Sequence, residues 1–195
     1  PPPAARASAP APLQQLMVGE GGNWTKAMLE AASHLTNNTP VSITIAGTHQ
    51  LEATAAFGAT RGGELWITGE QGATVHVAGA ADALLLSFAF DAPPVTLVGL
   101  ALVGHLDSGS QRLRVTNCSF VSPGPQAHNR SALLVHAGRA ELQDVRFTYL
   151  LGGAMQVNGG YVTVSDSVLS YNEARRGAAA NVSGGILIFF RCGMD

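Results

Sequence analysis

Charged side chains are scarce in this 195-residue sequence, because Asp, Glu, Lys and Arg make up only 12% of it, about half the usual share. The formal net charge is −2, so neither the basic surface typical of nucleic-acid binding nor one suited to anionic lipid is indicated. The longest apolar stretch, residues 84–104, is interrupted by Asp91, Pro93 and Pro94 and is too broken to cross a bilayer. We therefore expect no nucleic-acid partner and no membrane span.

Cysteine is equally scarce, with only Cys118 and Cys192, whose spacing matches no metal or redox motif. The sequence therefore predicts no metal site and no cofactor. Glycosylation sequons are abundant instead, and their number favours a secreted or cell-surface glycoprotein. The five candidate acceptors, out of eight asparagines, are Asn23, Asn37, Asn117, Asn129 and Asn181.

Helical periodicity occurs in one segment only, residues 25–35. Met28, Ala31, Ala32 and Leu35 share one face there, and Thr25 is a suitable capping residue. The N-terminal segment is rich in proline. It predicts an extended linker over residues 1–18, followed by one domain over residues 19–195. Because no other helical period appears, doubly wound α/β folds are disfavoured.

An eight-residue block with apolar first, third and eighth positions recurs along the rest of the chain. Alternation with period two predicts a strand, and the fifth position holds residues that tolerate a left-handed backbone, so it predicts a corner. Truncated copies start at Ile43 and Leu65, and a looser one at Ile186. The four full blocks start at Val95, Leu113, Ala140 and Val162, and their corner residues are Gly99, Asn117, Asp144 and Asp166.

A second corner follows a valine between blocks, at Gly138, Gly159 and Gly184. A repeat of about 24 residues with two fixed corners is one coil of a solenoid. The sequence thus predicts an all-β fold, a right-handed parallel β-helix of about seven coils with a short N-terminal capping helix.

In that register Cys118 and Cys192 lie three coils, or about 14 Å, apart. A disulfide needs Cα atoms within about 7 Å, so we expect these cysteines not to pair.

Two segments carry a family resemblance. Residues 147–157 (FTYLLGGAMQV) and 169–182 (LSYNEARRGAAANV) resemble the Phe-x-x-Asn…Gly-Gly-Ala repeat of polymorphic outer-membrane-protein-type β-helices. The first copy lacks the Asn, and the second has Gly177-Ala178 in place of Gly-Gly. The early helix followed by residues 41–47 is similar to the opening of pectin-lyase-like proteins, in which a helix covers the first coil. The resemblance implies a β-helix shared by adhesins, wall proteins and lyases.

No catalytic set of the related enzymes is recognisable. Polygalacturonase-like enzymes would require Asn-Thr-Asp and an Asp pair, and the sequence has neither. Asp144 and Asp166 fall at equivalent positions on adjacent coils and, with Asn117, predict a polar ladder of turn residues; a calcium or carboxylate site is the alternative. We therefore expect no catalytic residues and no enzymatic activity.

The leading hypothesis is a non-enzymatic extracellular scaffold, adhesin or assembly subunit. The final residues offer an apolar edge without a cap, and such edges recruit other chains, so we expect either that the C-terminal end is incomplete or that protein subunits cover it as partners. One alternative is a polysaccharide lyase or hydrolase-like β-helix fragment. The other is a carbohydrate-binding module with glycan partners, in which Tyr149 and Tyr171, with Trp66 and Tyr161, stack on sugars.

Overall fold

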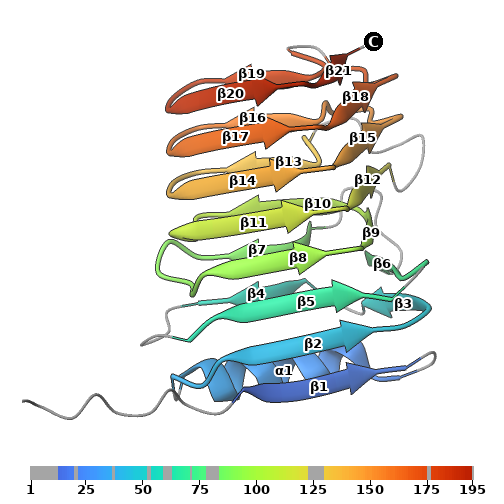
Figure 1. The fold of residues 1–195 in the computed structure, drawn as a ribbon, viewed down its shortest axis with the longest axis vertical. Coiled ribbons are helices and arrows are strands. Elements are labelled where there is room, and N and C mark those ends of the chain that lie inside the picture. Colours follow the sequence, from blue (N-terminus) through green and yellow to red (C-terminus); the bar gives the residue numbers. More distant parts are fainter. Residues whose placement is uncertain are drawn as a thin grey trace, which may run out of the picture.

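The computed structural model describes residues 13–19, 22–36, 38–51, 54–58, 63–70, 72–77, 84–122, 130–174 and 177–194. These residues form a parallel β-helix in which each turn contributes one strand to each of three sheets, here named A, B and C (Figure 1). In Figure 1 the sheet A strands run from left to right in front, and the chain returns behind them while it climbs, so the coil is right-handed. The predicted fold class is confirmed.

Sheet A forms one long face of the coil. Its eight strands pair in parallel in the order β1 (Gln14–Val18), β2 (Val41–Ile45), β5 (Leu65–Gly69), β8 (Val95–Val98), β11 (Arg112–Thr116), β14 (Arg139–Gln143), β17 (Tyr161–Ser165) and β20 (Ile186–Phe190).

Sheets B and C close each turn. Sheet B contains β3 (Thr48–Leu51), β6 (Thr74–Val77), β9 (Ala101–Val103), β12 (Ser119–Val121), β15 (Arg146–Thr148), β18 (Val168–Ser170) and β21 (Gly193–Met194). Sheet C contains β4 (Ala55–Phe57), β7 (Leu84–Phe88), β10 (His105–Ser108), β13 (Leu133–Val135), β16 (Met155–Val157) and β19 (Ala180–Val182). Six turns therefore have a strand in all three sheets, rather than the seven expected, because the last block supplies only β20 and β21 among the described residues.

The core is a column of apolar side chains from successive turns. Val115 pairs in register with Leu142, and Leu142 with Val164, and all three are buried. On sheet B the rings of Phe120 and Phe147 stack with centroids 4.7 Å apart and planes 6° apart. Burying each such side chain contributes about 1.5–3 kcal/mol, so this column is the main source of stability.

Helix α1 (Trp24–Thr36) covers the N-terminal end of the column, where it contacts β1 to β4 (Figure 1). Its buried face includes Met28, Ala31 and Leu35. Thr25 lies inside the helix instead of capping it. The cap is Asn23, whose Oδ1 accepts a hydrogen bond from the Lys26 N–H at 2.8 Å.

Strand β1 corrects the predicted linker. The proline-rich composition predicts an extended linker over residues 1–18, yet residues 14–18 pair with β2 along its whole length and bury Val18. Gln15 and Met17 face outward and Leu16 and Val18 face the core, but the apolar Met17 masks this alternation in the sequence. The proline-rich residues 1–12 lie outside the described residues.

Two repeat copies pair in a different register from the predicted one. Val41, rather than Ile43, pairs with Leu65, and a shift of two residues keeps the same side chains inside. At the other end Leu187, rather than Ile186, pairs with Val162. A shift of one residue exchanges the two faces, so Ile186 and Ile188 point outward.

Replacing a core residue of β14 should cost far more stability than replacing its outward neighbour. We expect Leu142→Ala to lower the free energy of unfolding by about 2–5 kcal/mol, because it leaves a cavity in the column. The matched variant Gln143→Ala removes an exposed side chain and should change it by at most about 0.5 kcal/mol. Urea unfolding measures both, and similar losses for the two variants would contradict the inward column.

Candidate functional site

The corners between sheets A and B form a ladder of left-handed residues. Gly99, Asn117, Asp144 and Asp166 have φ values of 69°, 50°, 53° and 52°, and Arg191 continues the series at 52°. Asn and Asp tolerate this conformation better than other non-glycine residues, which explains the choice of side chains. The ladder is thus first a backbone device that turns the chain from one sheet into the next.

The acidic part of this ladder does not form a paired carboxylate site. Asp166 is held by Arg191, with Nε 2.7 Å from Oδ1 and Nη2 2.8 Å from Oδ2. Among the described residues no three His, Cys, Asp or Glu side chains lie close enough together to hold a metal ion. A groove of about 520 Å³ runs along the corners, and its polar side chains include Glu70, Asn117, Asp144 and Arg146.

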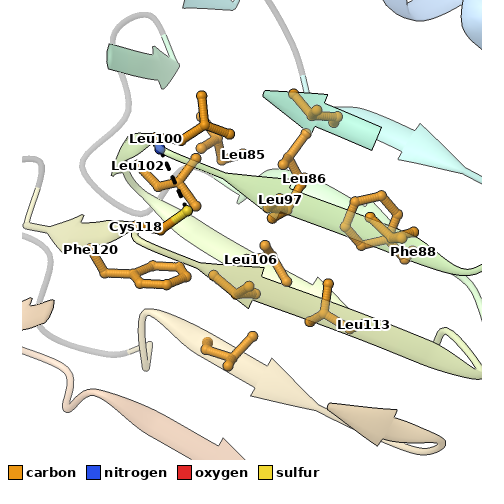
Figure 2. Packing of buried hydrophobic residues seen from close by; sticks show 14 of the residues in the cluster. Leu85, Leu86, Phe88, Leu97, Leu100, Leu102, Leu106, Leu113, Cys118 and Phe120 are labelled. Carbon is orange, nitrogen blue, oxygen red and sulfur yellow. Dashed lines mark hydrogen bonds between the residues drawn. The ribbon is translucent and has the colours of Figure 1, made fainter. Parts of the chain in front are cut away.

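The residue after each corner points into the core, and three of these residues, Cys118, Ser167 and Cys192, donate a hydrogen bond to the carbonyl two residues back. Cys118 Sγ donates to the Thr116 carbonyl at 3.3 Å. It accepts from the Leu100 N–H at 3.5 Å, which is the dashed line in Figure 2. Ser167 Oγ repeats the pattern, donating to the Ser165 carbonyl at 2.7 Å and accepting from the Val145 N–H at 3.0 Å. Cys118 therefore serves as a turn-closing residue.

Both cysteines are unpaired. Cys118 is buried, and Cys192, at the equivalent position of the last turn, is half-buried. Burial raises the pKa of the Cys118 thiol to about 11, because the desolvated thiolate is disfavoured more than its backbone hydrogen bonds favour it. Its thiolate is therefore rare at neutral pH, and this buried thiol is a poor nucleophile.

The two tyrosines singled out in the sequence lie side by side at the corner between sheets B and C. The rings of Tyr149 and Tyr171 have centroids 5.1 Å apart and planes 7° apart. The two residues are 64% and 66% exposed, and both have a left-handed backbone, with φ of 57° and 55°. Bulky residues rarely adopt this conformation, so the position carries strain at two successive turns. Trp66 and Tyr161 lie apart from this pair, in sheet A.

Three of the five sequons fall on described residues. Asn23 is exposed and uses only its side-chain oxygen for the helix cap. Asn117 is exposed at its corner, and Asn181 is half-buried in β19. Asn37 and Asn129 lie outside the described residues.

The last turn exposes an apolar surface. Ile186, Ile188 and Phe190 of β20 point outward and are 54%, 43% and 59% exposed. At the registers of Ile188 and Phe190 the preceding strand β17 carries Thr163 and Ser165. Strand β20 is therefore apolar on both faces, unlike its neighbour.

A charged cluster on the outer face of sheet A escaped the sequence reasoning. Arg112, Arg114 and Arg139 all contact the carboxylate of Glu141. The sequence contains an indication of this cluster, because Arg112 and Arg139 each stand one residue before a repeat block and are therefore neighbours on adjacent turns. Both arginines lie just outside the eight residues that define the repeat.

Comparisons of the chain with protein-family models, curated proteins and solved structures find no match. Among the described residues no helix is long and apolar enough to cross a membrane.

The two thiols should differ in reactivity. We expect iodoacetamide at pH 8 to modify Cys192 in the folded protein much faster than Cys118, because Cys118 is buried and its pKa is raised. In denaturing urea both should react at similar rates. Peptide mass spectrometry measures the two rates separately, and equal rates in the folded state would contradict the buried, hydrogen-bonded position of Cys118.

Proposed function

We propose that the chain is a non-enzymatic, secreted or cell-surface glycoprotein that serves as a structural scaffold and assembles with other protein subunits through its last turn. The observation that carries this proposal is the strand β20, which exposes Ile186, Ile188 and Phe190 on its outer face. A strand that is apolar on both faces is typical of a sheet covered on both sides.

The geometry of the last turn supports contact with another chain. Leu187 and Phe189 pack against the core from one side only, and Met194 of β21 is 47% exposed. Among the described residues β19, β20 and β21 each have one neighbour in their sheet, so each can pair with a further strand, which in this proposal belongs to a partner. Contiguous exposed apolar surface of this kind is characteristic of interaction sites. At the opposite end α1 covers the column, so assembly is directed to one end.

The location outside the cell rests on the sequons. Asn23 and Asn117 are exposed, as an acceptor for a glycan must be. A glycan on Asn117 would occupy the groove along the corners, which would shield the polar ladder from solvent.

Membership of the pectin-lyase-like superfamily, close to the polymorphic outer-membrane-protein-type repeats, is part of the same proposal. The contacts of Asn172 support it, because this is the asparagine of the Phe-x-x-Asn motif. Its Oδ1 accepts from the Leu150 N–H at 3.1 Å, and its Nδ2 donates to the Phe147 carbonyl at 2.9 Å. The motif residue thus joins two turns.

Charges placed on the outer face of β20 should abolish assembly. The double variant Ile188→Lys with Phe190→Lys should weaken association at least about 100-fold, because burying each native side chain contributes about 1.5–3 kcal/mol. The matched control is Thr163→Lys with Ser165→Lys, at the same registers one strand away. Sedimentation velocity of the full chain over a wide concentration range measures association of its copies, with wild type and control associating alike.

Two outcomes would count against the proposal. A wild-type chain that stays monomeric at all concentrations would exclude assembly between copies of this chain. Cleavage of a uronate polymer, with or without calcium, that is lost in Asp144→Ala would show instead a lyase or hydrolase, with its acidic residues in the groove along the corners.

A second candidate function, carbohydrate binding, is favoured by the tyrosine pair. Two coplanar exposed rings at a strained backbone position suit stacking against the apolar face of a sugar. No packing need explains two bulky left-handed residues there, because both side chains are mostly exposed.

Substitution by asparagine separates binding from folding at this pair. Asparagine tolerates the left-handed backbone, so Tyr149→Asn with Tyr171→Asn should remove the rings while changing the free energy of unfolding by no more than about 1 kcal/mol. We expect binding of neutral glycans on an array to be lost in this variant and retained in Tyr161→Asn. Equal binding by both variants would refute a role for the pair.

A further inference from the structure

A shallow depression of about 260 Å³ crosses the outer face of sheet A above β8. The register makes its shape clear, because Trp66, Thr96 and Arg114 are direct neighbours on β5, β8 and β11. The small Thr96 thus lies between two long side chains. The floor is formed by Pro94, Val95 and Thr96, one wall by Glu64 and Trp66, and the other wall by Arg112 and Arg114.

The width of the depression suits a single sugar ring. Its walls stand on strands two positions apart, which corresponds to about 9.6 Å between their backbones. One wall offers an indole and a carboxylate, and the other offers two guanidinium groups. Such a mixture of an aromatic face with a few convergent polar groups is typical of small-ligand sites.

The arginine wall carries more positive charge than its protein partner neutralises. Arg114 Nη2 lies 2.8 Å and Arg139 Nε 2.9 Å from the Glu141 carboxylate. The hydrogen bond from Arg114 is the largest cause that lowers the pKa of Glu141, so this carboxylate is ionised at neutral pH. Arg112 Nη2 is 3.6 Å from the same carboxylate, too far for a hydrogen bond. Three guanidinium groups thus share one carboxylate, and Arg112 is the least engaged.

The placement of Arg112 beside Arg139 lowers the stability of sheet A, and the β-helix fold does not require it. Arg112 and Arg139 are direct register partners on β11 and β14, and like charges directly opposite each other destabilise a sheet. Arg139 is held by Glu141 and by the ring of Tyr161, whose centroid lies 5.6 Å from its guanidinium carbon, whereas Arg112 is 53% exposed and lies 3.6 Å from Glu141. Arg112 thus departs from a local rule with little structural gain, as is expected at functional positions.

We propose that this depression binds an acidic sugar unit of a glycan. The carboxylate or sulfate group of the sugar accepts hydrogen bonds from Arg112 and Arg114, and the ring lies against the indole of Trp66. Glu64 accepts hydrogen bonds from the sugar hydroxyls. The site binds and makes or breaks no covalent bond.

The chemistry of the opposite wall selects a sugar over an acidic peptide. Glu64 lines the same depression as the two arginines, and its carboxylate would repel a second negative charge. A sugar with one acidic group presents hydroxyl donors on its other side, which a carboxylate accepts well. The depression is also separate from Tyr149 and Tyr171, which lie at the corner between sheets B and C, so this inference stands independently of both proposed functions.

Titration of the full chain with defined sugars tests the site, with tryptophan fluorescence as the readout. The probes are a glucuronate-containing trisaccharide, sialyllactose and a 6-sulfated galactose disaccharide, and lactose is the neutral control. We expect the acidic probes to bind, and the identity of the best one distinguishes a carboxylate from a sulfate source. Affinity should fall as salt is raised, because the arginines are exposed.

Four variants assign the contacts. Arg112→Gln and Arg114→Gln should each weaken binding about tenfold or more, whereas Arg146→Gln, at another exposed arginine that lies outside the depression, should have no effect. Calorimetry should show loss of binding in Trp66→Thr.

Four results would overturn the proposal. Two concern the acidic sugars: none of them binds, or lactose binds as tightly as they do. The other two are that Arg146→Gln weakens binding as much as Arg112→Gln, or that an aspartate-rich peptide binds as tightly as the acidic sugars. Circular dichroism of each variant verifies that the β-helix is intact, and all four changed positions are on the outer surface, so loss of the fold is not expected.

Discussion

The parallel backbone hydrogen bonds between successive turns govern every other feature of this structure. They place equivalent residues of neighbouring turns about 4.8 Å apart, so any side chain that recurs at one position meets its own counterpart. Inside the coil this produces stabilising columns, such as the stacked Phe120 and Phe147. Outside the coil the same constraint brings Tyr149 against Tyr171 and Arg112 against Arg139. Repeated apolar side chains stabilise the interior, whereas repeated side chains on the exterior form stacked aromatic rings and clusters of charge.

The same constraint explains which parts of the fold were predictable from the sequence. In the repeat blocks between residues 95 and 169 most inward positions are apolar and most outward positions are polar, so the alternation defines the register. Strand β20 has no such contrast, since all five of its residues are apolar, and the predicted register was off by one residue there. At the second corner the left-handed glycines are Gly138, Gly160 and Gly185, whereas the repeat predicts Gly138, Gly159 and Gly184. Adjacent glycines gave no basis for choosing between them.

Features of a single residue were easier to predict than contacts between turns. A corner filled by Gly, Asn or Asp indicates a left-handed backbone by its chemistry alone, and Gly99, Asn117, Asp144 and Asp166 all adopt it. The pairing of Asp166 with Arg191 depends on the register of β20, which the sequence did not define. The cluster around Glu141 needs the correct alignment of two turns and the outward direction of four side chains. Neither follows from the identity of any one residue.

Three surfaces of the molecule depart from what the repeat alone would require, and they occupy different parts of the coil. The arginine wall lies on the outer face of sheet A, the tyrosine pair lies at the corner between sheets B and C, and the apolar surface of β20 lies on the last turn. Each turn of a solenoid contacts only its neighbouring turns, so a substitution on the outside of one turn leaves the other turns intact. Separate surfaces on such a rod do not compete for space. A scaffold of this kind can therefore hold a protein subunit at its end while its sides bind glycans, which makes the assembly and sugar-binding proposals compatible on one chain.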